Sequence, residues 1–382
     1  MNLYRRSVEV ILQNQAGSGA YVASPNFPSY GYCWLRDGSF IAHAMDCVGE
    51  HGSARAFLRW VDRTIRRYAW KVERVLDRLE QGHPPDGGET LHTRYTLDGD
   101  EATSEWWNFQ LDGYGTWLWA LGRHVSVTGD TALLAEVTES IQVTVRYLSA
   151  SWTLPNYDCW EEHPQYLHPY TLAAIYAGLE AADSMAPASG QPVPAFPRHA
   201  HGAAAAEQVR RFVLEHGVQD GRLAKSIRSR GEHAAASPEQ AAAVDASLVG
   251  VTTPYRLLAP DEPVMQATVA RIETDLHCPG GGVHRYLADT YYGGGEWVLL
   301  AAWLGWHYAE VGQWEQAQEL LHWVEAQADG DGYLPEQVSV HLLAPDRHAE
   351  WEARWGPVAK PLLWSHAMYL ILQRALEVAR QG

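Results

Sequence analysis

Apolar residues recur at helical spacing along almost the whole of this 382-residue chain. Spacings of three and four residues place such side chains on one face of an α-helix. Period-two alternation is rare and short, and Gly, Pro and Asp separate the helical stretches, so the sequence predicts an all-α fold. Four of the predicted apolar faces are formed by Ala54, Phe57, Leu58 and Val61; by Leu111, Tyr114, Leu118 and Leu121; by Trp297, Leu300, Ala301, Leu304 and Tyr308; and by Trp314, Ala317, Leu321 and Val324.

Helical stretches that follow one another in this way predict either a closed helical toroid or an open helical solenoid, and periodicity alone does not choose between them. The clearest predicted loop is the Pro-rich stretch 186–202, and a second polar stretch covers 228–239. Neither is long enough to serve as an interdomain linker. We therefore expect residues 1–382 to form a single domain.

Composition excludes some classes of partner. The formal net charge is −17 and the Lys and Arg residues are scattered, so no basic stripe is available for a nucleic acid. The chain holds 17 Trp and 19 Tyr against only 6 Phe. Most of these rings are expected to fill the helical core, but rings with a polar edge also suit half-wet clefts in which sugar faces stack.

The sequence gives no sign of a membrane segment or of a cofactor. Residues 1–6 lead into a polar stretch without the apolar core of a signal peptide, and no run of about 18 apolar residues occurs. His163 and His168 have a spacing that fits no ordinary metal motif, so we expect no metal. Reduced thiols in a cytoplasmic protein are the favoured interpretation of four widely spaced cysteines, Cys33, Cys47, Cys159 and Cys278.

Two short strings each place a carboxylate beside aromatic or rigid neighbours: residues 157–162 and residues 332–337. Hydrolysis of a glycosidic bond needs two carboxyl groups, one protonated and one ionised. Neighbours such as Trp160 and Pro335 are surroundings that can separate two carboxyl pKa values. Since 46 Asp and Glu offer many accidental pairs, the two strings need support from elsewhere in the chain.

Four further strings, residues 30–38, 106–115, 285–297 and 361–367, are polar and aromatic and lie at predicted helix boundaries. The adjacent Arg and Asp of the first string suit sugar hydroxyls, although an ion pair with a helix cap would look the same. The second string fits a sugar-binding role and a purely structural role, a helix cap followed by core aromatic residues, about equally well. In the third, consecutive glycines allow either close approach to a ligand or a tight turn. The fourth favours a purely structural helix start.

In their order, these strings resemble glycoside hydrolase family 15, the glucoamylase family. They are Tyr-x-Tyr-x-Trp-x-Arg-Asp at 30–37, Gln-x-Asp-Gly at 110–113, Asp-x-Trp-Glu-Glu at 158–162, Arg-Tyr at 285–286 before Tyr-Tyr-x-Gly-x-x-Trp at 291–297, and Pro-Glu-Gln at 335–337. The resemblance spans roughly residues 20–370 and implies an (α/α)6 barrel of paired helices. No β-sandwich domain is expected before this barrel and no starch-binding module after it.

The resemblance also implies residue roles. Glu161 corresponds to the general acid, Glu336 to the general base and Tyr30 to a tyrosine that orients the attacking water. Glu162 corresponds to a residue that holds the sugar on the leaving-group side. Repulsion between Glu161 and Glu162 is expected to help keep the acid protonated.

Sugar-binding roles follow in the same way. Arg36, Asp37 and Arg285 correspond to residues that grip the non-reducing glucose, Trp106 to a ring over the acid, and Asp158 to a carboxylate that supports the acid's loop. The remaining expected substrate-binding residues are Trp34, Gln110, Asp112, Trp160, Tyr292 and Trp297.

The expected activity is therefore inverting, exo-acting hydrolysis of short α-gluco-oligosaccharides, with release of β-D-glucose from the non-reducing end. Isomaltose-type α-1,6 bonds are favoured, and maltose-type α-1,4 hydrolysis and trehalase activity remain open because residues 163–168 differ from those of starch-acting relatives. A phosphorylase and a non-catalytic sugar-binding protein are the alternatives of another class. Glu336 in its Pro-Glu-Gln setting argues against the phosphorylase, which needs no base to activate water.

Overall fold

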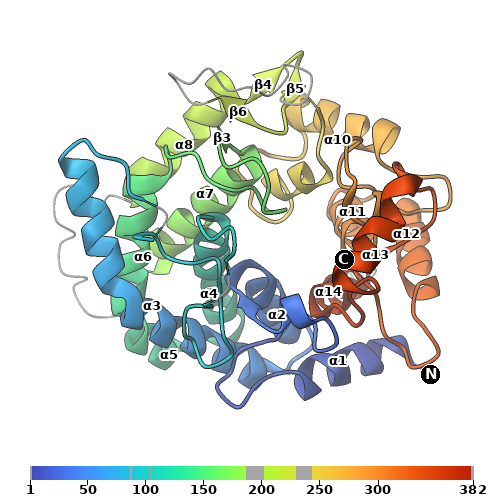
Figure 1. Ribbon diagram of the computed structural model, residues 1–382, viewed down its shortest axis with the longest axis horizontal. Helices are drawn as coiled ribbons and strands as arrows, with labels where there is room; N and C mark the ends of the chain where they lie inside the picture. The colour runs from blue at the N-terminus through green and yellow to red at the C-terminus, as the bar shows by residue number, and fades with distance from the viewer. Residues whose placement is uncertain (1, 87, 104, 186–201, 229–242, 380–382) are drawn as a thin grey trace.

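The computed structural model describes residues 2–86, 88–103, 105–185, 202–228 and 243–379. Six helical segments form an inner ring, seen end-on in Figure 1, in which each segment packs on the next and α14 packs back on α2. That last contact closes the ring and excludes the open solenoid, so the predicted (α/α)6 barrel is confirmed. In chain order the inner segments are α2 (Leu35–Cys47), α4 (Asp112–Thr128), α7 (Pro169–Met185), the 3-10 helix η3 (Ala246–Val251), α11 (Val298–Glu310) and α14 (Leu363–Ala379).

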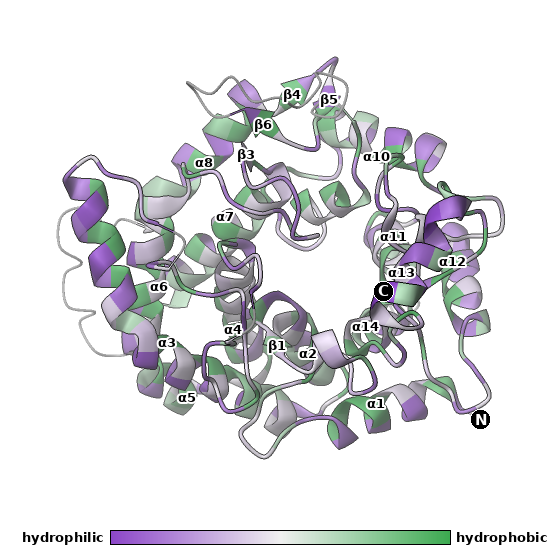
Figure 2. Cartoon of the chain, in the orientation of Figure 1, coloured by the Kyte–Doolittle hydropathy of each residue, from purple (hydrophilic) through white to green (hydrophobic). Residues whose placement is uncertain are grey.

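A second layer of helices surrounds the inner ring (Figure 1). The inner helix α11 is apolar on nearly all sides, whereas the outer helix α3 buries the predicted face that includes Phe57 and Val61 and turns most of its charged residues outward (Figure 2). This difference in hydropathy is what assigns each helix to its layer. The outer helices are α1 (Leu3–Gln13), α3 (His51–Glu80), α5 (Thr131–Glu136), α6 (Thr138–Ser151), α8 (Gly202–His216), α10 (Pro263–Asp275) and α12 (Trp314–Ala326).

Two glycines allow the inner helices α4 and α7 to touch backbone to backbone. A Cβ atom added to Gly115 would lie 2.3 Å from the carbonyl oxygen of Ala174, and one added to Gly178 would lie 2.5 Å from the carbonyl oxygen of Gly115. No larger side chain fits at either position without pushing the two helices apart.

Short antiparallel strand pairs tie together the loops at one end of the barrel. The strands β1, β3 and β7 each end at, or one residue before, the residue that precedes an inner helix, namely α2, α7 and α11. They therefore hold the loops that lead into the amino-terminal ends of those helices. The pairs are β1 (Cys33–Trp34) with β2 (Arg94–Tyr95), β3 (Tyr166–Leu167) with β6 (Ile227–Arg228), β4 (Val218–Gln219) with β5 (Arg222–Leu223), and β7 (Glu296–Trp297) with β8 (Gln337–Val338).

Two parts of the chain lie outside this scheme. The helix α13 (Pro345–Trp355) packs on the 3-10 helix η4 (Tyr291–Gly293), in front of the ring in Figure 1. The predicted loops 186–202 and 228–239 lie outside the described residues, except for Gly202, where α8 begins, and Arg228, where β6 ends. Among the described residues, no helix is both long enough and apolar enough to cross a membrane.

Candidate active site

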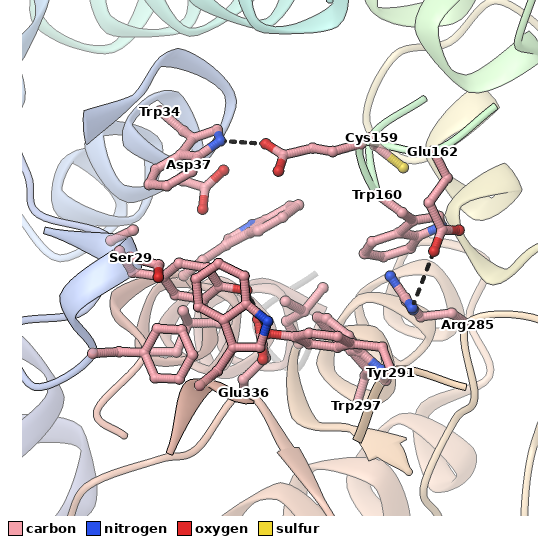
Figure 3. Close-up of a pocket in the computed structure, with 18 of the residues that line it drawn as sticks. Ser29, Trp34, Asp37, Cys159, Trp160, Glu162, Arg285, Tyr291, Trp297 and Glu336 are labelled. Atoms are coloured by element: carbon pink, nitrogen blue, oxygen red, sulfur yellow. Dashed lines mark hydrogen bonds and ion pairs between the residues drawn. The ribbon is translucent and has the colours of Figure 1, made fainter. Parts of the chain in front are cut away.

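A cavity opens at the end of the barrel where the short strand pairs lie. Figure 3 shows Asp37 on one wall, Trp160 and Arg285 on the wall across from it, and Glu336 along another side. Eleven of the residues expected from the sequence line this cavity: Tyr30, Trp34, Arg36, Asp37, Trp106, Trp160, Glu161, Glu162, Arg285, Trp297 and Glu336.

Glu161 lies in a strained loop. Its φ angle is +67°, in the left-handed region that residues with a Cβ rarely occupy. Asp158 holds the loop in this form, because one of its carboxylate oxygens accepts hydrogen bonds from the backbone N–H groups of Trp160 at 2.9 Å and Glu162 at 2.8 Å. The predicted support of the acid's loop by Asp158 therefore has a direct geometric basis.

The carboxyl group of Glu161 lies inside the cavity wall. The indole N–H of Trp34 donates a hydrogen bond to its Oε1 at 2.5 Å. Burial raises the pKa of Glu161, while Arg36 and the Trp34 hydrogen bond act in the opposite direction. The raised pKa suits a proton donor. Its main cause is burial and not repulsion from Glu162, which corrects the sequence-based explanation.

Glu336 immediately precedes β8, which pairs with β7, and its carbonyl oxygen accepts a hydrogen bond from the N–H of Val298 at 3.1 Å. The Tyr30 hydroxyl donates to its Oε1 at 3.0 Å, and the Tyr291 hydroxyl lies 2.9 Å from that of Tyr30. Within the described residues, Oε2 is buried and has no hydrogen-bond partner. One oxygen of this carboxyl group is therefore held, and the other is available to a water or a ligand.

Burial raises the pKa of Glu336 to about 8, although the Tyr30 hydrogen bond and Arg285 both lower it. The sequence-based expectation was that the surroundings would push the pKa values of the two carboxyl groups apart. In the structure the pKa values of Glu161 and Glu336 are both raised. The direction of the shift therefore does not distinguish acid from base.

Arg36 and Asp37 form a polar part of the cavity wall. The Nη1 atom of Arg36 donates to Gln110 at 3.0 Å and to Asp112 at 3.1 Å, and Nε lies 3.4 Å from the Asp37 carboxylate. Burial raises the pKa of Asp37 to about 6, which Arg36 opposes. Asp37 lies in the first turn of α2 and is not its N-cap, which is Trp34.

Arg285 is held on the opposite wall by a bidentate pair with Asp289, with Nε to Oδ2 at 2.7 Å and Nη2 to Oδ1 at 2.5 Å. Its Nη2 atom also lies 3.7 Å from Glu162. Rings surround the guanidinium group, including Trp160 at 5.3 Å and Trp297 at 4.9 Å from ring centroid to Cζ. A planar fork that is held in this way presents its free edge to a ligand in a fixed direction.

Four expected substrate-binding residues do not line the cavity. Gln110 and Asp112 lie behind Arg36 and orient it, and Asp158 lies behind the Glu161 loop. Tyr292 is fully buried, and its hydroxyl donates to the carbonyl oxygen of Gly356 at 2.7 Å. Its φ of +48° turns this ring away, so Tyr291 lines the cavity in its place.

The sequence analysis missed a buried charge network under the acid's loop. The Lys225 ammonium lies 2.6 Å from Asp245 and 3.5 Å from Asp158, and Asp245 accepts from the indole N–H of Trp160 at 3.0 Å. Lys225 and Asp245 belong to none of the motifs found in the sequence. Only their partners Asp158 and Trp160 lie in such a motif, so the sequence did not point to the network. The network joins segments that are far apart in the sequence.

Aromatic residues near the carboxyl terminus were also missed. Trp351, Arg354 and Trp355 of α13 line the cavity, as does Trp364 at the start of α14. Residues 361–367 do form a helix start with inward aromatic packing, since the Trp364 ring stacks on Phe40 at 5.5 Å between centroids, and the Arg36 guanidinium lies 5.3 Å from the same ring. The available signal was the spacing of Trp351 and Trp355, which lie four residues apart and therefore on one face of a helix.

The sequence profile of Glycosyl hydrolases family 15 matches residues 1–329. The chain is 44% identical over 371 residues to the isomaltose glucohydrolase of Kribbella flavida, with 97% of this chain and 91% of that protein covered. Among solved structures, a wild-type glycosidase at 43% identity superposes with a TM-score of 0.89, covering 98% of this chain and 96% of the other.

A bacterial glucoamylase complexed with acarbose shares the fold at 18% identity, with a TM-score of 0.71 over 98% of this chain and 55% of that one. The cavity with its two buried carboxyl groups thus lies in a barrel shared with glucoamylases. The profile match and the 44% identity establish that the chain is a glycoside hydrolase and belongs to Glycosyl hydrolases family 15.

Proposed function

We propose that this enzyme is an inverting, exo-acting α-glucoside hydrolase that releases β-D-glucose from the non-reducing end of short α-gluco-oligosaccharides. The main support for this mechanism is the hydrogen bonding of the Glu336 carboxyl group. Tyr30 donates a hydrogen bond to one of its oxygens, and the other oxygen is buried in the cavity wall without a partner among the described residues. A carboxylate in that position can accept a proton from a water molecule.

In the proposed reaction, Glu161 gives its proton to the glycosidic oxygen while the bond to the anomeric carbon breaks. A water molecule attacks that carbon from the opposite face and loses a proton to Glu336. The glucose product carries the new hydroxyl in the β configuration, and the leaving sugar carries the proton from Glu161. Inverting enzymes hold the two carboxyl groups about 6.5 to 9.5 Å apart to admit this water.

The walls of the cavity supply the binding groups. Asp37 and the Arg285 guanidinium offer a charged acceptor and donors to the hydroxyls of the non-reducing glucose. Glu162 is proposed to contact the leaving sugar, since its carboxylate accepts from the Tyr286 hydroxyl and stands next to the acid in sequence. Trp106 and Trp160 offer ring faces on which sugars stack.

Isomaltose-type α-1,6 bonds are the favoured target. Support comes from the 44% identity to an isomaltose glucohydrolase over nearly the full length of both chains. Trp351 and Trp355 of α13 line the cavity and offer further ring faces to the sugar. Maltose-type α-1,4 bonds and trehalose are the competing substrates. Free cysteines at all four positions are compatible with the cytoplasmic setting we propose.

A substrate panel tests the proposal. The purified protein is incubated with isomaltose, isomaltotriose, maltose and trehalose, with and without inorganic phosphate, and glucose and glucose phosphate are measured. We expect the highest kcat/KM for isomaltose and no dependence on phosphate. Sugar phosphate as the product would indicate a phosphorylase, and absence of turnover on every α-glucoside would contradict the proposed substrate class.

A further inference from the structure

We propose that the protein has a second site, outside the sugar cavity, that binds one Zn²⁺ ion through Cys278, His284, Glu296 and His341. The sequence-based prediction of no metal rested on His163 and His168 and did not consider these four residues. The fold brings them together behind the strand pair β7–β8, on the side of the barrel that carries Glu336.

Three of the four donor atoms lie close together, and the fourth, Nε2 of His284, lies beside the sulfur of Cys278. The sulfur of Cys278 lies 3.0 Å from Nε2 of His284, and Nδ1 of His341 lies 2.5 Å from Oε1 of Glu296. Ligand atoms of Cys278, Glu296 and His341 all lie within 4.8 Å of one another. Around a tetrahedral zinc with bonds of about 2.0 to 2.3 Å, ligand atoms stand roughly 3.3 to 3.6 Å apart, so the two close pairs need to open by about 1 Å or less. The His284 ring, which lies outside the cluster of the other three ligands, has to move toward them when the ion binds.

A glycine turn builds half of the site. Cys278 and His284 stand on either side of a tight turn, in which the N–H of Cys278 donates to the carbonyl of Gly282 at 2.8 Å. A Cβ atom on Gly282 would lie 1.8 Å from Oε2 of Glu296. Glycine at this position is therefore what lets the Glu296 carboxylate reach the turn that carries the sulfur.

The histidine of this turn is already oriented as a ligand. Nδ1 of His284 lies 3.1 Å from the carbonyl oxygen of Gly295 and so must carry the proton in that hydrogen bond. Its Nε2 atom then has a free lone pair, which points toward the sulfur of Cys278. Zinc-bound histidines commonly donate their other N–H to a carbonyl in this way.

Charge also favours a cation here. Glu296 is only 2% exposed, and its one ion-pair partner among the described residues is His341, whose side chain is 52% exposed. Burying a carboxylate is costly unless its charge is compensated. A thiolate from Cys278 together with the Glu296 carboxylate would balance the charge of one Zn²⁺, and the exposed His341 leaves a route for the ion from solvent.

The donor set selects the kind of metal. One thiolate, two imidazoles and one carboxylate suit Zn²⁺ and its spectroscopic substitute Co²⁺, whereas Mg²⁺ and Ca²⁺ prefer oxygen ligands alone. With four protein ligands the site has no open position, which is typical of structural zinc.

The site is placed to stiffen the sugar cavity. His284 immediately precedes Arg285, and Glu296 immediately precedes Trp297, and both Arg285 and Trp297 line the cavity. A metal bound by these segments would tie together backbones that present groups to the substrate. This inference does not depend on which glucoside is hydrolysed.

Co²⁺ and Zn²⁺ titrations of the full-length, EDTA-treated protein test the proposal. We expect one equivalent of Co²⁺ to produce a sulfur-to-cobalt charge-transfer absorption, which Zn²⁺ then abolishes, and we expect Zn²⁺ to raise Tm. Cys278→Ser should lose the charge-transfer band. Cys47→Ser is the matched control: its sulfur also lies near a histidine, 3.7 Å from Nε2 of His43, but without a carboxylate ligand, and it should keep the band.

His341→Ala provides a second variant that removes a half-exposed side chain. It should weaken Zn²⁺ binding about 10-fold or more. Because it also removes the ion-pair partner of the buried Glu296, the unliganded Tm is expected to fall, and the Zn²⁺ affinity is measured at a temperature at which the variant is folded. A Zn²⁺ affinity that is unchanged in both Cys278→Ser and His341→Ala would show that surface groups bind the metal and would overturn the proposal. So would the absence of any charge-transfer band in the wild type.

Discussion

The Tyr30 hydroxyl donates a hydrogen bond to one carboxyl oxygen of Glu336 at 3.0 Å, and within the described residues the other oxygen is buried without a partner. This arrangement fixes the orientation of the carboxyl group and stabilises its ionised form against the effect of burial. Tyr291 lies 2.9 Å from the Tyr30 hydroxyl and, because Tyr30 donates to Glu336, can itself donate to Tyr30. The pair of tyrosines therefore supports the group to which we assign proton removal from water.

The hydrogen bond between Tyr30 and Glu336 should influence the pH dependence of kcat/KM. Burial raises the pKa of Glu336 to about 8, and the Tyr30 hydrogen bond lowers it. A base must be ionised, so kcat/KM is expected to rise with pH through a limb near 8. Tyr30→Phe removes the stabilisation of the carboxylate and should move this limb to higher pH. Tyr32→Phe, in the same string, should leave it in place, since that ring contacts Arg94 and Trp34. A limb that moves to lower pH in Tyr30→Phe would contradict the assignment.

The roles of Glu161 and Glu336 can be separated with a leaving group that needs no proton. Both Glu161→Gln and Glu336→Gln should reduce kcat on isomaltose by about 10²- to 10⁴-fold or more. On α-D-glucosyl fluoride, Glu161→Gln should retain much more activity, because fluoride leaves without protonation, whereas Glu336→Gln should remain inactive. Equal losses on both substrates in Glu161→Gln would mean that Glu161 is not the acid. Unchanged Tm values would show that both variants fold.

Lys225 should matter for both stability and activity. Its ammonium group lies between the buried carboxylates of Asp245 and Asp158. Lys225→Met leaves these two buried charges without their shared partner and should lower the free energy of unfolding by about 3 kcal/mol or more. It should also lower kcat by releasing the Glu161 loop.

Lys360→Met is the control for this prediction. Its ion pair with Asp329, at 2.9 Å, lies at the surface, with 43% of the lysine side chain exposed. Such pairs contribute about 0 to 1 kcal/mol. Urea unfolding of both variants measures the difference, and equal destabilisation would argue against a special role for the buried network.

How much of this site could be predicted from the sequence depends on where each residue stands. Arg36 and Asp37 lie in the first turn of α2 and Asp112 begins α4, so a local string at a helix boundary drew attention to them, and the family resemblance supplied their expected roles. Lys225 and Asp245 reach the site only through packing between distant segments, and no local pattern marks them.

Tyr291 and Tyr292 show a second limit. Which of two adjacent rings enters the cavity depends on one backbone angle, the φ of +48° at Tyr292, and the sequence alone does not specify it. Helical periodicity predicted an all-α fold but left the closed toroid and the open solenoid both possible. The family resemblance implied the closed barrel, and the contact between α14 and α2 confirms it.

The stereochemistry of the first product tests the central claim most directly. Isomaltose is hydrolysed by a high concentration of enzyme, and the anomeric proton signals are followed by NMR before mutarotation equilibrates them. With inversion, glucose from the non-reducing end arrives as the β-anomer, so the β signal should initially exceed its equilibrium share. An initial excess of the α-anomer would contradict the assignment of Glu336 as a base that activates water.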